Sequence, residues 1–178
     1  EIKSLDPETF EYTSAEAQDI GDVRAFKKAG DLEARLNALY ADDGRAGAFF
    51  RDTTLAILGY SARRIGEVTD NPADVDRAIR WGFGWEMGPF EKWDALGFET
   101  VRNGMKAHDV AIPEWVDAMQ DAGHTSFYRE SDGVREVYVP SEGRYVADPA
   151  PSDRLTLDPI KANPSNEIWR NDEAALLD

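Results

Sequence analysis

Apolar side chains recur at helical spacing along the middle of the chain. From Asp31, a residue suited to a helix N-cap, they return every three or four positions as far as Tyr40. This spacing predicts a short amphipathic helix, which the polar run Asp42-Asp43-Gly44 ends. Residues 45–68 carry apolar side chains on two faces, which predicts a central helix buried on both. One face holds Ala46, Phe49, Phe50, Thr53, Ile57, Tyr60, Ser61 and Arg64, and the other holds Leu55, Leu58, Ala62 and Ile65.

Proline, glycine and asparagine mark the ends of the helices that follow. Asn71-Pro72 predicts a helix over 72–82, because Asn accepts free amide hydrogens and Pro tolerates the first helical position. The run Gly82-Phe83-Gly84-Trp85 breaks that helix, and Gly88-Pro89 starts another, which Gly97 ends as a left-handed cap. Two further helices are expected, over residues 99–106 and 113–123.

The pattern changes after Gly123, where apolar and polar residues begin to alternate. With turn signals at Asp132-Gly133 and Glu142-Gly143, this stretch predicts a meander of two or three short strands. The segment NEIWRNDEAALLD near the end is interpreted as the start of a further sheet. We therefore expect a mainly α protein, a helix bundle with a small β-hairpin or meander appendage. Its predicted parts are an approach segment (1–30), a helical domain (31–123), the β appendage (124–147) and a Pro-punctuated linker leading towards a following domain (148–178).

Charge and composition narrow the classes of function. The 178 residues include 20 Lys and Arg against 35 Asp and Glu, for a formal net charge of −15. This excess opposes binding to nucleic acid or to an anionic membrane surface. With 42% hydrophobic residues the chain can bury a core, yet it has no apolar run long enough to span a membrane. The absence of cysteine removes disulfides and thiolate chemistry and is compatible with the cytoplasm, where we expect the protein.

The candidate chemical sites favour structural interpretations. The glycine-rich loop Gly82–Gly88 follows a predicted helix, whereas a phosphate-binding loop follows a strand, so nucleotide binding is not expected there. Asp94 lies between apolar Trp93 and Leu96, which favours a structural carboxylate that caps or pairs with Arg. His108 and His124 lack the spacing of a metal site, and no Ser occupies a nucleophile turn.

The central segment nevertheless carries an ordered motif. Asp76 and Ala78 are followed by Gly82-x-Gly84, then by Met87-Gly88-Pro89-Phe90, and finally by Asp94 and Gly97. In this order the residues resemble the C-terminal all-helical domain of the 3-hydroxyacyl-CoA dehydrogenase family. The glycines and the Gly-Pro start let helices turn sharply, so four aromatic side chains are expected to form one cluster: Phe83, Trp85, Phe90 and Trp93. Roles in packing or in an interface are predicted for Asp76, Gly82, Gly84, Met87, Gly88, Pro89, Phe90, Trp93, Asp94 and Gly97.

The resemblance also implies a role. It places the chain as the second helical unit of a long multidomain bacterial member, in which an NAD-dependent 3-hydroxyacyl-CoA dehydrogenase serves fatty-acid β-oxidation. NAD is then expected in the parent enzyme, with no cofactor, metal or catalytic residue in this chain. The expected partners are the dehydrogenase N-terminal domain and the first helical unit of the same parent chain, with the acyl-CoA substrate reached through the parent. A downstream enoyl-CoA hydratase-like domain and a homodimer stay open as further partners.

Two other classes of function remain as alternatives. The first is a self-standing helical dimerisation or interaction module without an enzymatic role. The second is an acid–base hydrolase that uses carboxylates such as Glu91 and Asp94.

Overall fold

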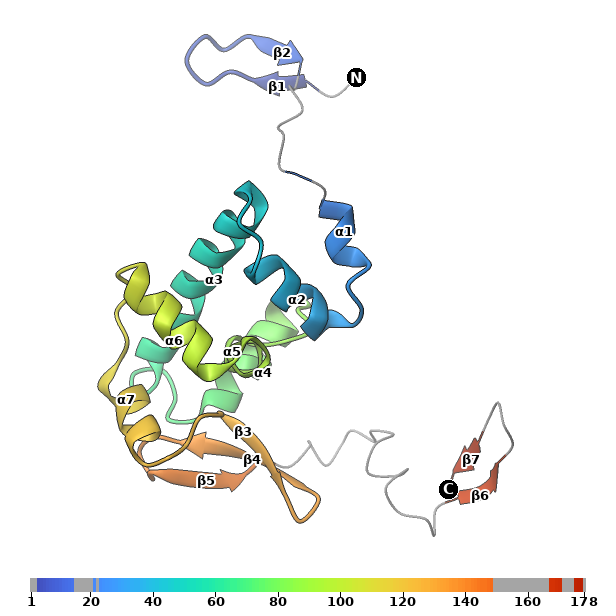
Figure 1. Cartoon of the computed structure of the whole chain (residues 1–178), viewed down its shortest axis with the longest axis vertical. Helices are drawn as coiled ribbons and strands as arrows, with labels where there is room; N and C mark the ends of the chain where they lie inside the picture. The colour runs from blue at the N-terminus through green and yellow to red at the C-terminus, as the bar shows by residue number, and fades with distance from the viewer. Residues whose placement is uncertain (1–2, 15–20, 22, 149–166, 171–174, 178) are drawn as a thin grey trace.

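The computed structural model describes residues 3–14, 21, 23–148, 167–170 and 175–177 (Figure 1). Within these residues it contains seven helices and three small antiparallel sheets, which confirms the predicted mainly α fold class. The helices are α1 (Val23–Lys27), α2 (Leu32–Tyr40), α3 (Arg45–Arg64), α4 (Pro72–Phe83), α5 (Pro89–Leu96), α6 (Phe98–Ala107) and α7 (Glu114–Asp121). The strands are β1 (Lys3–Leu5), β2 (Tyr12–Ser14), β3 (Tyr128–Ser131), β4 (Val134–Val139), β5 (Arg144–Ala147), β6 (Glu167–Arg170) and β7 (Ala175–Leu177).

Two of the predicted helix starts, at Asp31 and Asn71, are confirmed by side-chain caps. The side chain of Asp31 accepts a hydrogen bond from the backbone nitrogen of Ala34 at 2.9 Å, at the start of α2. Asn71 accepts one from the backbone nitrogen of Ala73 at 2.9 Å, ahead of α4. Each cap satisfies an amide hydrogen that has no partner within the first turn.

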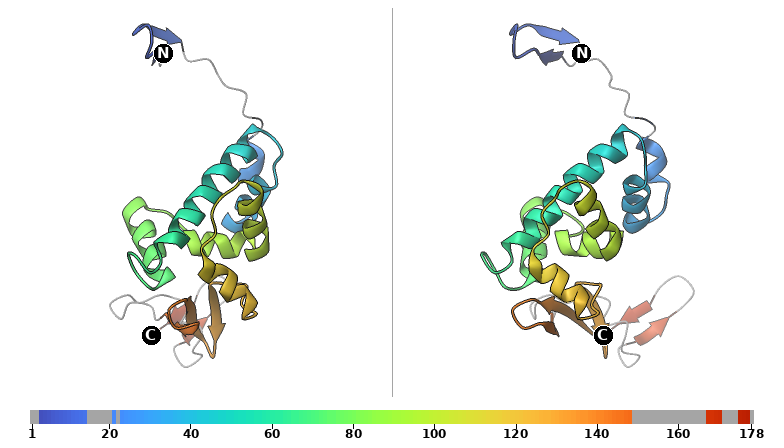
Figure 2. Two further views of the ribbon diagram at one scale, coloured as in Figure 1. Left: turned by 90° about the vertical axis from the view of Figure 1, so that its left-hand side faces the viewer. Right: turned by 60° about the vertical axis from the view of Figure 1, so that its left-hand side comes forward.

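Helix α3 runs through the middle of the helical body but is buried on one face only (Figure 2). Leu55, Leu58 and Ala62 point into the core. On the other predicted face Ser61 is buried, but the large side chains of Phe49, Ile57 and Tyr60 are exposed, with exposed fractions of 70%, 38% and 57%. The prediction of a helix buried on both faces is therefore wrong for the face that holds Phe49, Ile57 and Tyr60, and the helix ends at Arg64, before residue 68. Periodicity marks an apolar face, but it does not say what covers that face.

The β3-β4-β5 sheet is confirmed as an antiparallel meander, and it shares the core of the helices. Asp132 and Gly133 make the first turn with positive φ angles of 52° and 75°. Phe127, directly before β3, is fully buried among helical side chains. Figures 1 and 2 show the sheet at one end of the helical body, next to α7. The predicted appendage is thus packed against the bundle and helps to close it.

The aromatic centre of the core lies around the Phe127 ring. Its centroid lies 4.9 Å from that of Phe90 and 5.2 Å from that of Trp93, and both pairs are edge-on. Edge-on pairs of this kind stabilise a core beyond their buried area. The remaining buried members of this cluster are Leu55, Leu58, Ala62, Leu96, Phe98, Val101, Met105, Val116, Met119, Tyr138 and Tyr145.

The two ends of the chain contain elements that the sequence patterns predict only in part. The predicted approach segment contains the β1–β2 hairpin, whose strand residues are all exposed, and the short helix α1. Strands of three residues are too short to give a detectable alternation. The β6–β7 hairpin lies within the predicted start of a sheet, whereas residues 149–166 of the predicted linker lie outside the described residues. None of the described helices combines the length and the apolar character needed to cross a bilayer.

Candidate functional site

Asp76 of α4 caps the start of α5 from a distance of more than ten residues. Its carboxylate accepts hydrogen bonds from the backbone nitrogens of Phe90 at 2.8 Å and Glu91 at 2.9 Å. Gly88 occupies the N-cap position of α5 and has no side chain to do this, while Pro89 has no amide hydrogen to satisfy. Asp76 therefore replaces the local cap and ties the two helices together.

Gly88 is required for this arrangement because the two segments touch. A Cβ atom at Gly88 would lie 2.4 Å from three atoms of Asp76, far inside van der Waals contact. The backbone nitrogen of Gly88 donates to the Glu91 carboxylate at 2.9 Å, which satisfies one more donor at the helix start. The motif residues Asp76, Gly88, Pro89 and Phe90 thus form one unit: a carboxylate, the space it needs, and the helix start that it caps.

The environment of Asp76 changes its acidity. Its side chain is buried, and burial raises its pKa to about 7, although hydrogen bonds to the carboxylate act in the opposite direction. One of these bonds comes from the Tyr128 hydroxyl at 2.7 Å, from the first residue of β3. Burial likewise raises the pKa of Tyr128, with the neighbouring Asp76 adding to the effect, so this hydroxyl keeps its proton and acts as a donor.

Asp94 makes a second connection, from α5 to the segment that enters β3. Its carboxylate accepts from the Ser126 hydroxyl at 2.8 Å and from the backbone nitrogens of Phe127 and Tyr128, each at 2.9 Å. These bonds hold the Phe127 ring in the aromatic core. Burial raises the pKa of Asp94 to about 6, while the three hydrogen bonds lower it. The predicted structural role as a capping carboxylate fits this geometry.

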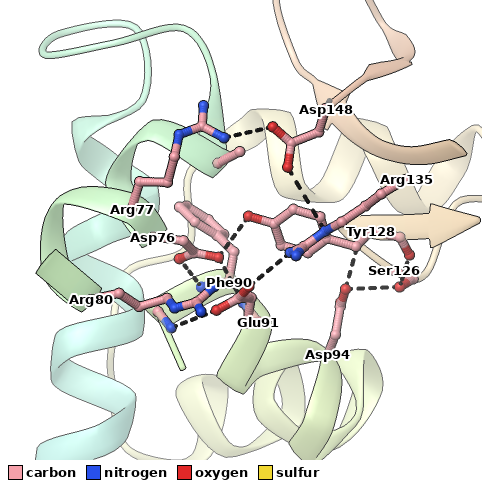
Figure 3. A network of polar contacts seen from close by, with 12 residues as sticks. Asp76, Arg77, Arg80, Phe90, Glu91, Asp94, Ser126, Tyr128, Arg135 and Asp148 are labelled. Atoms are coloured by element: carbon pink, nitrogen blue, oxygen red, sulfur yellow. Dashed lines mark hydrogen bonds and ion pairs between the residues drawn. The ribbon is translucent and has the colours of Figure 1, made fainter. Parts of the chain in front are cut away.

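A chain of ion pairs runs along the outside of both carboxylates (Figure 3). Glu91 lies between two guanidinium groups, with Arg135 at 2.8 Å and Arg80 at 3.1 Å. The Arg135 guanidinium also stacks over the Tyr128 ring, 4.0 Å from its centroid. On the far side Asp148 pairs with Arg77 at 2.6 Å. These ion pairs therefore join α4, α5 and the sheet. The hydrogen bonds of Asp76 and Asp94 connect the same parts of the chain.

The remaining motif residues have separate physical roles. Gly84 and Gly97 adopt φ angles of 67° and 90°, which favour glycine and end α4 and α5. Trp93 is fully buried, and its indole nitrogen donates to the carbonyl oxygen of Phe98 at 3.2 Å. Met87 lies half-buried in the loop before α5. Nothing in the structure explains Gly82, because a Cβ atom there would meet no neighbour within 4 Å.

The predicted cluster of four aromatic side chains is wrong for two of its members. Phe90 and Trp93 are fully buried, whereas Phe83 is 71% and Trp85 37% exposed. The αL conformation of Gly84 turns the chain away from the core at the end of α4. The core positions that the prediction gave to these two rings are instead taken by Phe127 and Trp115, which come from other elements.

Several partners in the network were missed from the sequence. Ser126, Tyr128 and Arg135 lie in or beside the β meander, at least 30 residues beyond the carboxylate or glutamate that each one contacts. The alternation of the meander could place Tyr128 on a face, but no local spacing links it to Asp76. Only the packing of the sheet on α4 and α5 brings these residues together.

The arrangement leaves little room for chemistry at either buried carboxylate. Both oxygens of Asp76 and of Asp94 accept hydrogen bonds from groups of this chain. The loop Gly84–Gly88 follows helix α4 rather than a strand, so it lacks the strand–loop–helix arrangement that binds a dinucleotide pyrophosphate. Among the described residues no group of three His, Asp or Glu side chains is placed to hold a metal ion. The His124 ring packs against the rings of Tyr138 and Tyr145, which also contact each other.

Comparisons with known proteins agree with the motif. The family model described as 3-hydroxyacyl-CoA dehydrogenase, C-terminal domain, matches residues 49–137, half of the chain. The chain is similar to a protein of Bacillus subtilis named "Probable 3-hydroxyacyl-CoA dehydrogenase", with 34% identity over 177 residues, or 99% of this chain and 22% of that protein. It is also similar to the "Putative fatty acid oxidation complex trifunctional enzyme" of Rickettsia felis, with 26% identity over 112 residues, or 57% of this chain and 16% of that protein. No solved structure gives a significant match.

The chain therefore belongs to the 3-hydroxyacyl-CoA dehydrogenase family, through the C-terminal domain of that family. It spans about a fifth of the length of the relatives that it matches. The matched region contains the whole of the motif and the two carboxylate connections, and its last residues lie in β4.

Proposed function

We propose that this chain is the helical part of an NAD-dependent 3-hydroxyacyl-CoA dehydrogenase of fatty-acid β-oxidation. In this role it supports the dehydrogenase active half by packing against it, and it is not catalytic alone. NAD and the catalytic groups belong to the dehydrogenase N-terminal domain, and the acyl-CoA substrate is bound through the parent enzyme. The family match and the two relatives support the reaction class.

The exposed face of α3 is the observation that carries the proposal. Phe49, Ile57 and Tyr60, which we call the outer face of α3, lie opposite the buried residues of the same helix. A helix in the middle of a bundle gains stability by covering such a face, and large apolar patches on a protein surface mark interaction sites. The dehydrogenase half or the first helical unit of the parent is the partner that the proposal assigns to it.

The polar network supports the same role. Asp76 and Asp94 make their hydrogen bonds to other parts of this chain, and the ion pairs of Glu91 do the same. Such a network fixes the relative positions of α4, α5 and the sheet, which suits a rigid support. Both carboxylate oxygens of Asp76 and of Asp94 already accept hydrogen bonds within the chain. This site therefore suits an acid–base hydrolase less well than it suits a rigid support.

Binding to the dehydrogenase half tests the proposal. The part of the Bacillus subtilis relative outside the matched region would be expressed separately and titrated with the 178-residue chain by calorimetry. We expect a complex that Phe49→Ala weakens by about tenfold or more, because exposed aromatic anchors dominate interfaces. Phe83→Ala is the matched control, since Phe83 is as exposed as Phe49 but lies on α4, and it should change the affinity by about twofold at most.

The alternative function gives a different result in the same preparation. If the chain is a self-standing dimerisation module, it forms a homodimer that Phe49→Ala dissociates, and the dehydrogenase half does not bind. Titration with NADH adds a separate check. A low-micromolar affinity of the chain alone for NADH would contradict the assignment of the cofactor to the N-terminal domain.

A further inference from the structure

A hollow of about 290 Å³ lies between α2 and the loop that joins α4 to α5, and none of Asp76, Glu91 and Asp94 lines it. Leu32 and Leu36 of α2 form one wall, and Trp85 and Met87 of the loop form the opposite one. The surface of the hollow is mainly apolar. Its volume is near the lower end of the range for small-molecule sites.

One cation lies in this apolar surrounding. Lys92 of α5 lines the hollow, and its ammonium nitrogen lies 4.3 Å from the centroid of the Trp85 ring. Among the described residues no carboxylate lies within ion-pair distance of it, although Glu86 also lines the hollow and is exposed. Burial lowers the pKa of Lys92, since an ammonium loses hydration there. An anion placed beside Lys92 would offset that loss.

The walls of the hollow are held in place by the motif. Gly84 begins the loop in the left-handed conformation, and Gly88 ends it in contact with Asp76. The loop is therefore fixed at both ends, and Trp85 is held between them. The ring of Phe83 lies 6.3 Å from that of Trp85 and is mostly exposed, so the apolar surface continues beyond the hollow.

We propose that this hollow is a binding site for an anionic group carried on an alkyl chain, with Lys92 contacting the anion and Leu32, Leu36, Trp85 and Met87 contacting the chain. A carboxylate and a phosphate share this chemistry. The ligand is selected by the negative charge at one end and by apolar contact along its alkyl chain. Neither the anionic group nor the alkyl chain alone is sufficient for binding.

Octanoate, octyl phosphate and octanol distinguish these contributions in a titration of the full 178-residue chain, followed by ¹H–¹⁵N NMR. The indole resonance of Trp85, assigned with Trp85→Phe, reports on the hollow itself. We expect octanoate or octyl phosphate to shift this resonance with a Kd of about 0.1–1 mM, and the tighter of the two identifies the head group. Octanol should bind at least about tenfold more weakly.

Variants of Lys92 then test the role of its charge. Lys92→Met keeps the apolar stem and should weaken binding of the anion by about tenfold, with octanol unaffected, whereas Lys92→Arg should retain binding. Lys106→Met is the control, because Lys106 is an exposed lysine on α6 outside the hollow, and it should have no effect. The proposal is overturned if the Trp85 resonance does not respond up to about 10 mM anion, or if Lys106→Met weakens binding as much as Lys92→Met.

Discussion

The α4–α5 corner and the outer face of α3 are both rich in aromatic and apolar side chains, yet their surroundings differ. At the corner, Phe90 and Trp93 are fully buried, and every motif carboxylate is bonded within the chain. On α3, Phe49 and Tyr60 face solvent. The motif that identifies the family therefore builds the fold. The surface that we propose for contact with another protein lies on a different helix, α3.

The largest expected difference between the two regions is in stability. Phe90→Ala should lower the free energy of unfolding by about 3–5 kcal/mol, because it leaves a cavity at the centre of the aromatic core. Phe49→Ala, the same substitution on the exposed face, should change it by about 0.5 kcal/mol or less. Urea denaturation of both variants measures the two values. Equal losses would remove the distinction between the buried corner and the exposed face.

Two glycines of the motif should respond in opposite directions. Gly88→Ala should destabilise the protein by about 1–3 kcal/mol, since its Cβ atom would overlap Asp76. Gly82→Ala lies within α4 with open space around it, and should stabilise by up to about 0.5 kcal/mol through helix propensity. Thermal unfolding distinguishes them. A stabilising Gly88→Ala would contradict the close approach of the loop to Asp76.

The buried carboxylates give the corner a pH dependence. The pKa of Asp94 is raised to about 6 and that of Asp76 to about 7, so the folded chain holds protons that the unfolded chain has released. Their stabilising contribution is complete below pH of about 4 and is lost as the pH rises to about 7.

Asp94→Asn isolates this contribution. Between pH of about 4 and 6.5 the unfolding free energy of the original chain should fall by about 1–2 kcal/mol more than that of the variant, whatever the absolute stability of the variant. Asp121→Asn is the control at an exposed position of α7 and should keep the original slope. Parallel pH profiles for Asp94→Asn and the original chain would show that Asp94 titrates normally.

Sequence patterns located the helices well because their ends carry local signals. Asp31, Asn71 and Gly97 act on backbone groups within a few residues, so a short window contains the whole cause. The network could not be located in this way. The contact of Asp76 with Tyr128 depends on how the meander packs on α4. The exposure of Phe83 depends on the direction in which the chain turns at Gly84, and the glycine alone does not determine that direction. Burial of a predicted apolar face likewise depends on neighbours that the pattern does not specify.

The most direct test of the supporting role is hydroxyl-radical footprinting of the chain, alone and with the dehydrogenase half added. The account predicts that the oxidation rates of Phe49 and Tyr60 fall towards that of the buried Phe90, while Phe83 continues to react at its original rate. If Phe49 and Tyr60 react equally fast with and without the dehydrogenase half, the outer face of α3 is not the contact surface, and the proposed role is contradicted.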